Sequence, residues 1–260
     1  MIENKKRAED LTVVENRKIN KDYYVLKLAS KTDLPNILPG QFVELLVADT
    51  RNAFLRRPIS IYDVQMECNS FELLIQIVGE GTELMSKLEV GDIINTMYPL
   101  GNGFDTQTQA KRVLLVGGGV GVAPLLYLAK ALNEKGIRPQ ILLGGRATGN
   151  IIELENFKKQ GDVYISTEDG SLGEKGFVTQ HSIMTEQFDK IYTCGPDPMM
   201  RAVADIAFQK GIDCEVSLEN MMACGIGACL CCVTDTKEGH KCVCTDGPVF
   251  NTKELKWNIA

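Results

Sequence analysis

Short apolar runs separated by turn residues fill the first hundred positions of the chain. β-branched and aromatic side chains gather in four such runs, at residues 11–14, 23–28, 41–47 and 71–78. Strands of this length and spacing are typical of a small antiparallel barrel. A stretch at 82–88 is long enough for one short helix. We therefore predict a β-barrel domain over residues 1–106.

The pattern changes after Lys111. The strand expected at 112–116 is continuously apolar from Val113 onward, as in a parallel strand buried on both faces, and a helix is expected at 125–135. Further strands are expected at 140–146, 162–166 and 190–193. This alternation predicts a parallel-sheet α/β domain over residues 107–215, in which ligands bind at the carboxyl ends of the strands.

Composition narrows the class of protein. The chain has 260 residues, of which 24% are charged and 44% hydrophobic, and its net charge is −6. These values are ordinary for a soluble globular protein, and the lack of a basic block argues against a nucleic-acid partner. The uncharged run at 113–129 contains glycines and a proline and falls short of the roughly 20 apolar residues of a membrane span.

The cysteine content bears on the compartment. No apolar stretch follows the basic residues near the N-terminus, so no signal peptide is evident. Nine cysteines without an export signal indicate the reducing cytoplasm, where cysteines are more often metal ligands than disulfides.

Four cysteines near the end of the chain have the spacing C-x4-C-x2-C-x11-C. They are Cys224, Cys229, Cys232 and Cys244. The first three follow the plant-type spacing for a [2Fe–2S] cluster. Gly225 and Gly227 let the loop fold back, so that backbone amides can face the cluster sulfurs. The fourth cysteine follows closely, which indicates a small cluster module, predicted over residues 216–260, rather than a complete ferredoxin.

Other uses of these cysteines are weaker. A zinc site usually pairs two C-x2-C knuckles, and an x4 gap followed at once by x2 fits poorly. Cys231 and Cys242 lie in the same segment, and either can in principle replace a ligand. We interpret both as non-ligands because the x2 and x11 gaps are the commoner ones.

Two barrel segments suggest a flavin site. The segment Arg56-Arg57-Pro58-Ile59-Ser60 is expected to end a strand, with both guanidiniums free to hold a pyrophosphate and the Ser60 hydroxyl at a flavin edge. An ordinary surface Arg-Pro turn would have the same residues. Residues 79–82 precede the predicted helix, where bare amides suit a phosphate, although a flexible loop is the alternative.

A glycine-rich loop follows the first strand of the α/β domain. Residues 117–124 read G-x-G-x-x-P in place of G-x-G-x-x-G, with Pro124 near the first helical turn. Strand, glycine loop and helix form the phosphate-binding arrangement of a dinucleotide domain. Its candidate binding residues are Gly118, Gly119, Gly121 and Pro124.

A second loop follows the strand at 190–193. It begins Cys194-Gly195-Pro196, after which Asp197 is expected to cap a helix and Pro198 to open it. A free cysteine is often merely buried. At the ligand-binding edge of the sheet, however, we favour a role for Cys194 beside the nicotinamide, with Gly195 and Pro196 in the same site.

Together these motifs resemble a known family. Arg-Pro-Ile-Ser, Gly-Gly-Gly-Val-Gly-Val-Ala-Pro-Leu and Cys-Gly-Pro-Asp-Pro-Met are similar to motifs of the ferredoxin–NADP reductase superfamily. Met-Ala-Cys-Gly-Ile-Gly-Ala-Cys and Asp-Gly-Pro-Val-Phe narrow the resemblance to the electron-transfer subunits of class 1B dihydroorotate dehydrogenases. It implies FAD in the barrel, NAD on the α/β domain and a [2Fe–2S] cluster in the module. It also implies an FMN-containing catalytic subunit as partner, in a heterotetramer of two plus two.

The resemblance assigns residues to these cofactors. Cys224, Cys229, Cys232 and Cys244 match the cluster ligands of the family. Ser60 and Cys194, placed above beside the flavin and the nicotinamide, are our catalytic candidates. Cys231 departs from the family, which has another residue there. The FAD contacts are Arg57, Pro58, Ile59 and Ser60, supported by Gln76, Ile77, Gly81 and Thr82.

Electron counting orders the three cofactors. Hydride transfer to NAD moves two electrons and a cluster carries one, whereas FAD does both and is therefore expected between them. We predict flow from the partner's FMN through the cluster and FAD to NAD⁺, with the cluster on the rim at the subunit interface. The acid expected about 20 residues after the glycine loop is missing. Arg146 can meet a 2′-phosphate or be a surface charge, and the resemblance favours NAD.

Two rival functions remain. The small FAD/[2Fe–2S] subunits of ferredoxin–NADP transhydrogenase and sulfide dehydrogenase complexes share these domains, but they commonly carry an aspartate at the position of Cys224. A non-catalytic protein with a zinc-binding tail would leave the flavin and nucleotide loops without a purpose.

Overall fold

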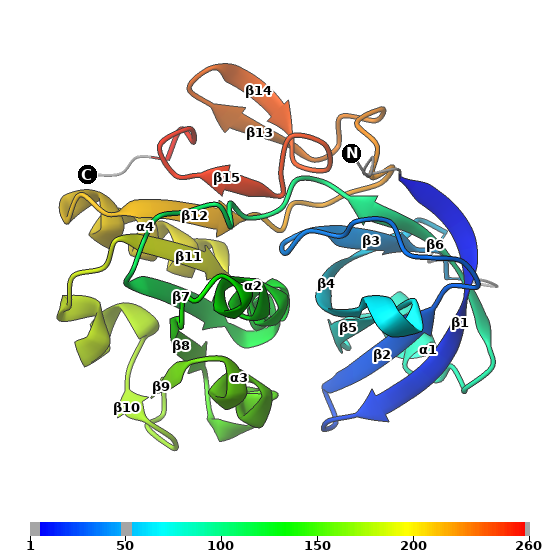
Figure 1. Ribbon diagram of the computed structural model, residues 1–260, viewed down its shortest axis with the longest axis horizontal. Helices are drawn as coiled ribbons and strands as arrows, with labels where there is room; N and C mark the ends of the chain where they lie inside the picture. The colour runs from blue at the N-terminus through cyan, green and yellow to red at the C-terminus, as the bar shows by residue number, and fades with distance from the viewer. Residues whose placement is uncertain (1–5, 48–53, 258–260) are drawn as a thin grey trace.

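The computed structural model describes residues 6–47 and 54–257. Its first part is a closed six-stranded antiparallel barrel with the order β1-β2-β5-β4-β3-β6, at the right of Figure 1. The predicted β-barrel is therefore confirmed. The strands are β1 (Arg7–Lys18), β2 (Tyr23–Ala29), β3 (Phe42–Leu45), β4 (Arg57–Gln65), β5 (Ser70–Gln76) and β6 (Ile93–Leu100).

Alternate side chains of β3 pack on opposite faces of the barrel wall. Val43 and Leu45 point into the barrel core, with which they share one buried cluster. Phe42 instead belongs to a second buried cluster, formed with the C-terminal part of the chain. Because successive strand residues face opposite sides, β3 fills the barrel and also provides a platform outside it.

Two local predictions in the barrel need correction. The Arg-Pro-Ile-Ser segment begins β4 rather than ending a strand, because the apolar run of this strand lies after the motif. The short helix α1 spans Glu80–Met85, earlier than expected. It starts early because the Thr82 hydroxyl accepts hydrogen bonds from the N–H groups of Val78 (2.9 Å) and Gly79 (3.2 Å). A short 3₁₀ turn, η1 (Met66–Cys68), joins β4 to β5.

The second part is a seven-stranded sheet with the order β10-β9-β8-β7-β11-β12-β15. All its neighbouring pairs are parallel except β12 with β15, so the predicted parallel-sheet α/β fold is confirmed. Its strands are β7 (Val113–Gly118), β8 (Gln140–Gly145), β9 (Asp162–Thr167), β10 (Glu174–Lys175), β11 (Lys190–Cys194), β12 (Asp213–Ser217) and β15 (Val249–Asn251).

Helices cover this sheet. They are α2 (Ala123–Glu134), α3 (Leu154–Gln160) and α4 (Asp197–Gln209), with 3₁₀ turns η2 (Gly119–Val122), η3 (Thr148–Asn150), η4 (Val178–Gln180) and η5 (Ser182–Thr185). Pro124 lies in the first turn of α2, as predicted. Asp197 does not cap α4: Pro196 occupies the N-cap position, and the Asp197 carboxylate accepts from Arg201 Nε at 2.7 Å. Within the described ranges, no helix is long and apolar enough to cross a membrane.

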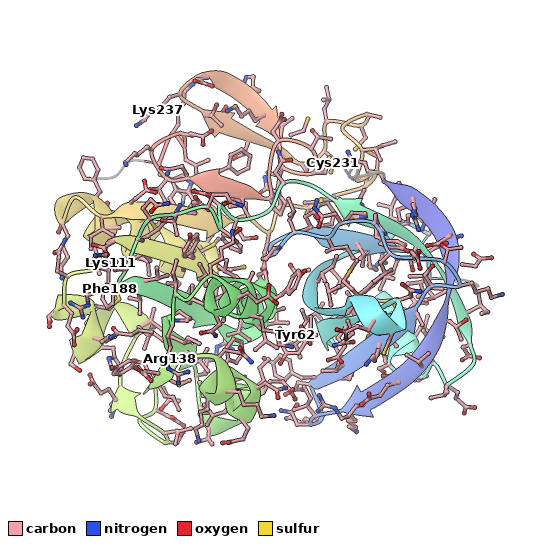
Figure 2. All side chains as sticks on the ribbon, in the orientation of Figure 1. Tyr62, Lys111, Arg138, Phe188, Cys231 and Lys237 are labelled. Atoms are coloured by element: carbon pink, nitrogen blue, oxygen red, sulfur yellow. The ribbon has the colours of Figure 1, made fainter. Side chains whose placement is uncertain are left out.

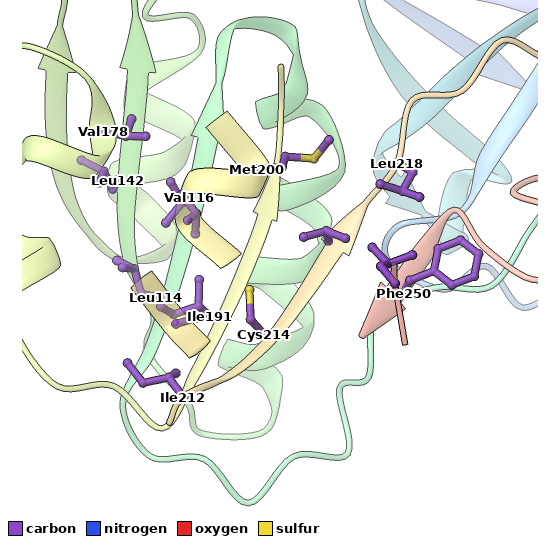
Figure 3. Close-up of a cluster of buried hydrophobic side chains, with 14 of the residues drawn as sticks. Leu114, Val116, Leu142, Val178, Ile191, Met200, Ile212, Cys214, Leu218 and Phe250 are labelled. Carbon is purple, nitrogen blue, oxygen red and sulfur yellow. The ribbon is translucent and has the colours of Figure 1, made fainter. Parts of the chain in front are cut away.

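The C-terminal part lies above both other parts in Figure 1. It contains the hairpin of β13 (Val233–Thr236) and β14 (Gly239–Cys242), and then β15, which extends the nucleotide-domain sheet. Figure 3 shows buried side chains running from Leu114 and Val116 on β7 to Phe250 on β15. This segment is therefore packed into the core of the sheet. The domain limits at 106 and 215 remain predictions.

A buried lysine fastens the linker after the barrel to the sheet. Lys190 Nζ lies 2.7 Å from Glu215 Oε1, 3.2 Å from Asp105 Oδ2 and 3.6 Å from Asp213 Oδ2. Only 5% of the Lys190 side chain is exposed. The Asp105 N–H also donates to Glu215 Oε2, at 3.0 Å. These bonds fix where the chain passes from the barrel to the first sheet strand.

Candidate functional site

The four predicted cluster cysteines lie in one loop system in two pairs. The Cys229 N–H donates to Cys224 Sγ at 3.4 Å, and the Cys244 N–H donates to Cys232 Sγ at 3.4 Å. The Gly227 N–H also donates to Cys244 Sγ, at 3.2 Å. Gly227 has φ +80, so the turn that aims this amide needs a residue without a β-carbon.

These amides change the acidity of the thiols. Burial opposes ionisation of Cys224, yet the N–H groups of Ile226 and Cys229 lower its pKa to about 6. Burial raises the pKa of Cys244 to about 12. Cys224 is thus a ready thiolate, whereas Cys244 gives up its proton when a metal replaces it.

The pairing fits a two-iron cluster, in which four thiolates bind two irons. Across the described ranges, no three thiol, imidazole or carboxylate groups converge as ligands of one metal ion. The donor set and its amide hydrogen bonds therefore fit the iron–sulfur group that the spacing predicts.

The two additional cysteines occupy different positions. Cys231 is exposed and lies on the outer loop of the module in Figure 2. Cys242 is half-buried on β14, where its N–H donates to Asp246 Oδ2 at 2.7 Å. Their interpretation as non-ligands remains a prediction.

On the barrel, the two arginines have different roles. Arg56 donates to the backbone oxygens of Glu44 (3.2 Å) and Asn95 (3.1 Å) and to Asn95 Oδ1 (2.5 Å), so it ties three strands together. Arg57 lies against α1, since a β-carbon on Gly81 would be 2.7 Å from Arg57 Nε. The Arg57 guanidinium also donates to the backbone oxygen of Leu55, at 2.5 Å. Because Arg56 is bound within the barrel, we keep Arg57 as the candidate for a pyrophosphate, and this role remains a prediction.

The remaining predicted FAD residues lie along one edge of the barrel. Pro58 and Ser60 pair with Glu44 and Phe42 across β3. Gln76 ends β5, just before the loop to α1. One of the amides that were expected to be bare, that of Gly79, instead donates to the Thr82 hydroxyl, as does the preceding amide of Val78. The close approach of Arg57 to the bare backbone of Gly81 is the feature that fits a pyrophosphate-binding cradle.

The glycine loop packs directly against the Cys194 turn. A β-carbon on Gly121 would lie 2.4 Å from Gly195 Cα, and one on Gly118 would lie 2.6 Å from Met199 Sδ. These glycines therefore let two strand ends meet. Gly119 has φ +57 and open space around it, so it keeps the freedom to face a ligand.

Cys194 is completely buried at the end of β11. Burial raises the pKa of its thiol well above the usual range, and the S–H donates to Glu219 Oε1 at 3.8 Å. A role beside the nicotinamide remains a prediction. Glu219 was missed from the sequence, because no local pattern connects it with a cysteine 25 residues earlier.

A second missed residue is Glu44. It is fully buried, and burial raises its pKa to about 7. It was missed because a single acid within an apolar strand run resembles an outward-facing surface residue. Arg146, the predicted nucleotide-selecting residue, is exposed after β8.

Comparison with known domain families divides the chain in three. Residues 10–104 match an oxidoreductase FAD-binding domain, and residues 115–205 match an oxidoreductase NAD-binding domain. Residues 219–256 match the iron–sulfur cluster binding domain of dihydroorotate dehydrogenase B. The three expected cofactor-binding regions are therefore confirmed.

Solved structures share this architecture, and we describe two of them. One is that of an NADH-dependent reduced ferredoxin–NADP oxidoreductase, with a TM-score of 0.86, 31% identity, and coverage of 95% of this chain and 90% of that chain. The cytochrome b5 reductase domain of Ulva prolifera nitrate reductase shares the fold, with a TM-score of 0.66 and 18% identity over 81% of this chain and 96% of that chain.

Curated relatives match over nearly their whole length. A protein of Fusobacterium nucleatum is 43% identical, covering 96% of this chain and 99% of its own. One of Caldanaerobacter subterraneus is 42% identical, covering 94% and 96%. Both are named dihydroorotate dehydrogenase B (NAD(+)), electron transfer subunit. This chain belongs to the family of dihydroorotate dehydrogenase B (NAD(+)) electron transfer subunits.

Proposed function

We propose that this chain is the electron-transfer subunit of an NAD-dependent dihydroorotate dehydrogenase. The observation that carries the proposal is the loop of two cysteine pairs with amides aimed at their sulfurs, held against a barrel and a nucleotide-binding sheet. When bound, the cluster and FAD supply one-electron transfer, and FAD and NAD supply hydride transfer. The chain provides sites for all three groups.

Each site has named residues. Cys224, Cys229, Cys232 and Cys244 hold the cluster, and their amide neighbours stabilise thiolate charge. Arg57, the first residue of β4, and Ser60, three residues further along the same strand, bind and orient FAD. The loops at Gly119 and Cys194 bind NAD at the carboxyl ends of β7 and β11.

The partner is a catalytic subunit that carries FMN, in an assembly of two plus two chains. Support comes from the apolar side chains around the cluster loop. Met221, Ile226 and Leu230 are 82%, 50% and 63% exposed. Exposed apolar side chains grouped on one surface mark protein interfaces. The docking surface thus coincides with the loop that carries the cysteines.

Anaerobic pull-down from the native host tests this function. A copurifying FMN protein that reduces orotate when NADH is supplied is the expected result. The second candidate is the small subunit of a ferredoxin–NADP oxidoreductase, favoured by the 0.86 TM-score. Copurification of a large transhydrogenase-type flavoprotein would select that candidate and refute the first.

A further inference from the structure

The strand register places Glu44 between two proposed cofactor sites. On β3, Glu44 pairs with Pro58 of β4 on one side and with Met97 of β6 on the other. Side chains directly opposite one another in a sheet share a face. Glu44 therefore points out of the barrel, on the same face as Pro58, which is one of the proposed FAD contacts.

The cluster loop lies directly on this carboxyl group. A β-carbon on Gly225 would be 2.8 Å from Glu44 Cγ and 3.2 Å from Glu44 Oε1. Gly225 also has φ +66, so the loop is shaped to lay bare backbone on the acid. The next residue back along the chain is Cys224, a proposed cluster ligand.

Glu44 is fully buried, and within the described part of the chain neither carboxyl oxygen has a hydrogen-bond partner. Arg56 lies nearby but donates to the Glu44 backbone oxygen and to Asn95. A buried polar group without a partner destabilises the fold, and an apolar side chain of similar size would pack there at lower free energy. Packing alone therefore does not account for an acid at this position.

We propose that Glu44 is a positioning residue that acts through the Cys224–Gly225 segment to set the reduction potential of the cluster. Cluster potentials depend on the charge, hydrogen bonding and solvent exposure around the sulfurs. A charge or a hydrogen bond from Glu44 acts more strongly here than in water because the dielectric around a buried group is low. The inference rests on the function proposed above and specifies how one of its three sites is adjusted.

The test compares Glu44→Met and Glu44→Gln with wild type, as full-length chains purified anaerobically with their copurifying subunit. EPR-monitored redox titration gives the cluster midpoint. We expect Glu44→Met to change the reduction equilibrium at least threefold, which is about 28 mV for one electron. A higher midpoint potential in Glu44→Met would show that the Glu44 side chain acts as a negative charge. A lower midpoint potential would show that it acts as a hydrogen-bond donor. Glu155→Gln is the matched control, an exposed acid on α3, on the opposite side of the molecule from the module (Figure 1).

Two further readouts separate tuning from a structural role. The EPR g-values of Glu44→Met should match those of wild type, which would show that the cluster itself is intact. The thermal unfolding temperature of Glu44→Met should be no lower than that of wild type. Unchanged midpoints in both Glu44 variants overturn the inference. So does a Glu44→Met chain that folds but retains no cluster. Should Glu44→Met not fold, the near-isosteric Glu44→Gln decides by the same midpoint criterion.

Measurements on the wild-type chain distinguish a failure of the proposed function from a failure of the role proposed for Glu44. A wild type without a [2Fe–2S] EPR signal would refute the proposed function itself. A wild type with that signal, whose Glu44 variants titrate at its potential, would refute only the role of Glu44.

Discussion

The contact between the glycine loop and the Cys194 turn makes Gly121→Ala the sharpest perturbation of the nucleotide site. The added β-carbon would lie 2.4 Å from Gly195 Cα and 2.6 Å from Gly195 N. Both are backbone atoms at strand ends, so no side chain can rotate away. Overpacking of this kind costs about 1–3 kcal/mol. We expect NADH to bind only when the two loops keep their original packing. The cost of restoring that packing then weakens the affinity for NADH by roughly 5- to 140-fold.

The assay is anaerobic flavin reduction by NADH in a stopped-flow instrument, with the rate followed against NADH concentration. The apparent Kd should rise by the factor above, while the FAD content of the purified chain, read from its visible absorbance, should not change. Gly149→Ala is the matched control, because a β-carbon there meets nothing within 4 Å. It adds the same methyl group to the same domain without a clash.

The reasoning is refuted by a Gly121→Ala chain whose NADH affinity and melting temperature both stay within experimental scatter of wild type. It is also refuted if Gly149→Ala weakens NADH binding as much, because the effect would then follow from any added methyl group rather than from the clash with Gly195.

Three further predictions address the cluster, the linker and pH. Cys229→Ser should abolish electron exchange with the partner but spare NADH oxidation by artificial acceptors; unchanged NAD-linked dihydroorotate turnover would contradict the scheme. Lys190→Met leaves Glu215 buried without its cation and should destabilise the chain by about 3–5 kcal/mol, with Lys190→Met/Glu215→Gln recovering part of the loss in denaturant titrations. Burial lowers the pKa of His181 below 6.5, so the unfolded chain binds the proton more readily. Stability should therefore fall as pH drops below about 6.5, and His181→Gln should flatten that slope in melting curves between pH 5 and 7.5.

Features that depend on neighbouring residues were readable from the sequence. The cysteine spacing predicts a cluster loop because the first three ligands and the turning glycines lie within nine residues of each other. The continuous apolar strands and the glycine loop likewise predicted the α/β domain, since strand burial and helix starts follow local patterns. The Arg-Pro-Ile-Ser motif was recognised for the same reason, although its place at the start of β4 was not.

Roles set by partners distant in sequence were not readable. Arg56 and Arg57 are adjacent and chemically identical, yet only the fold directs Arg56 to Asn95 and Arg57 to α1. Aspartate is a common N-cap residue, but Pro196 occupies the N-cap position of α4, and the Asp197 carboxylate accepts a hydrogen bond from Arg201.

The sequence by itself determined the cluster spacing, the barrel and the parallel sheet, because each is encoded in short-range periodicity. Only the tertiary structure decided that β15 joins the sheet, that Gly121 meets Gly195, and that Glu44 is buried under Gly225. Those contacts join residues that lie from 32 positions apart, for Ser217 of β12 and Val249 of β15, to 181 positions apart, for Glu44 and Gly225. Burial and close approach at such separations depend on how whole elements pack, which no local pattern of side chains records.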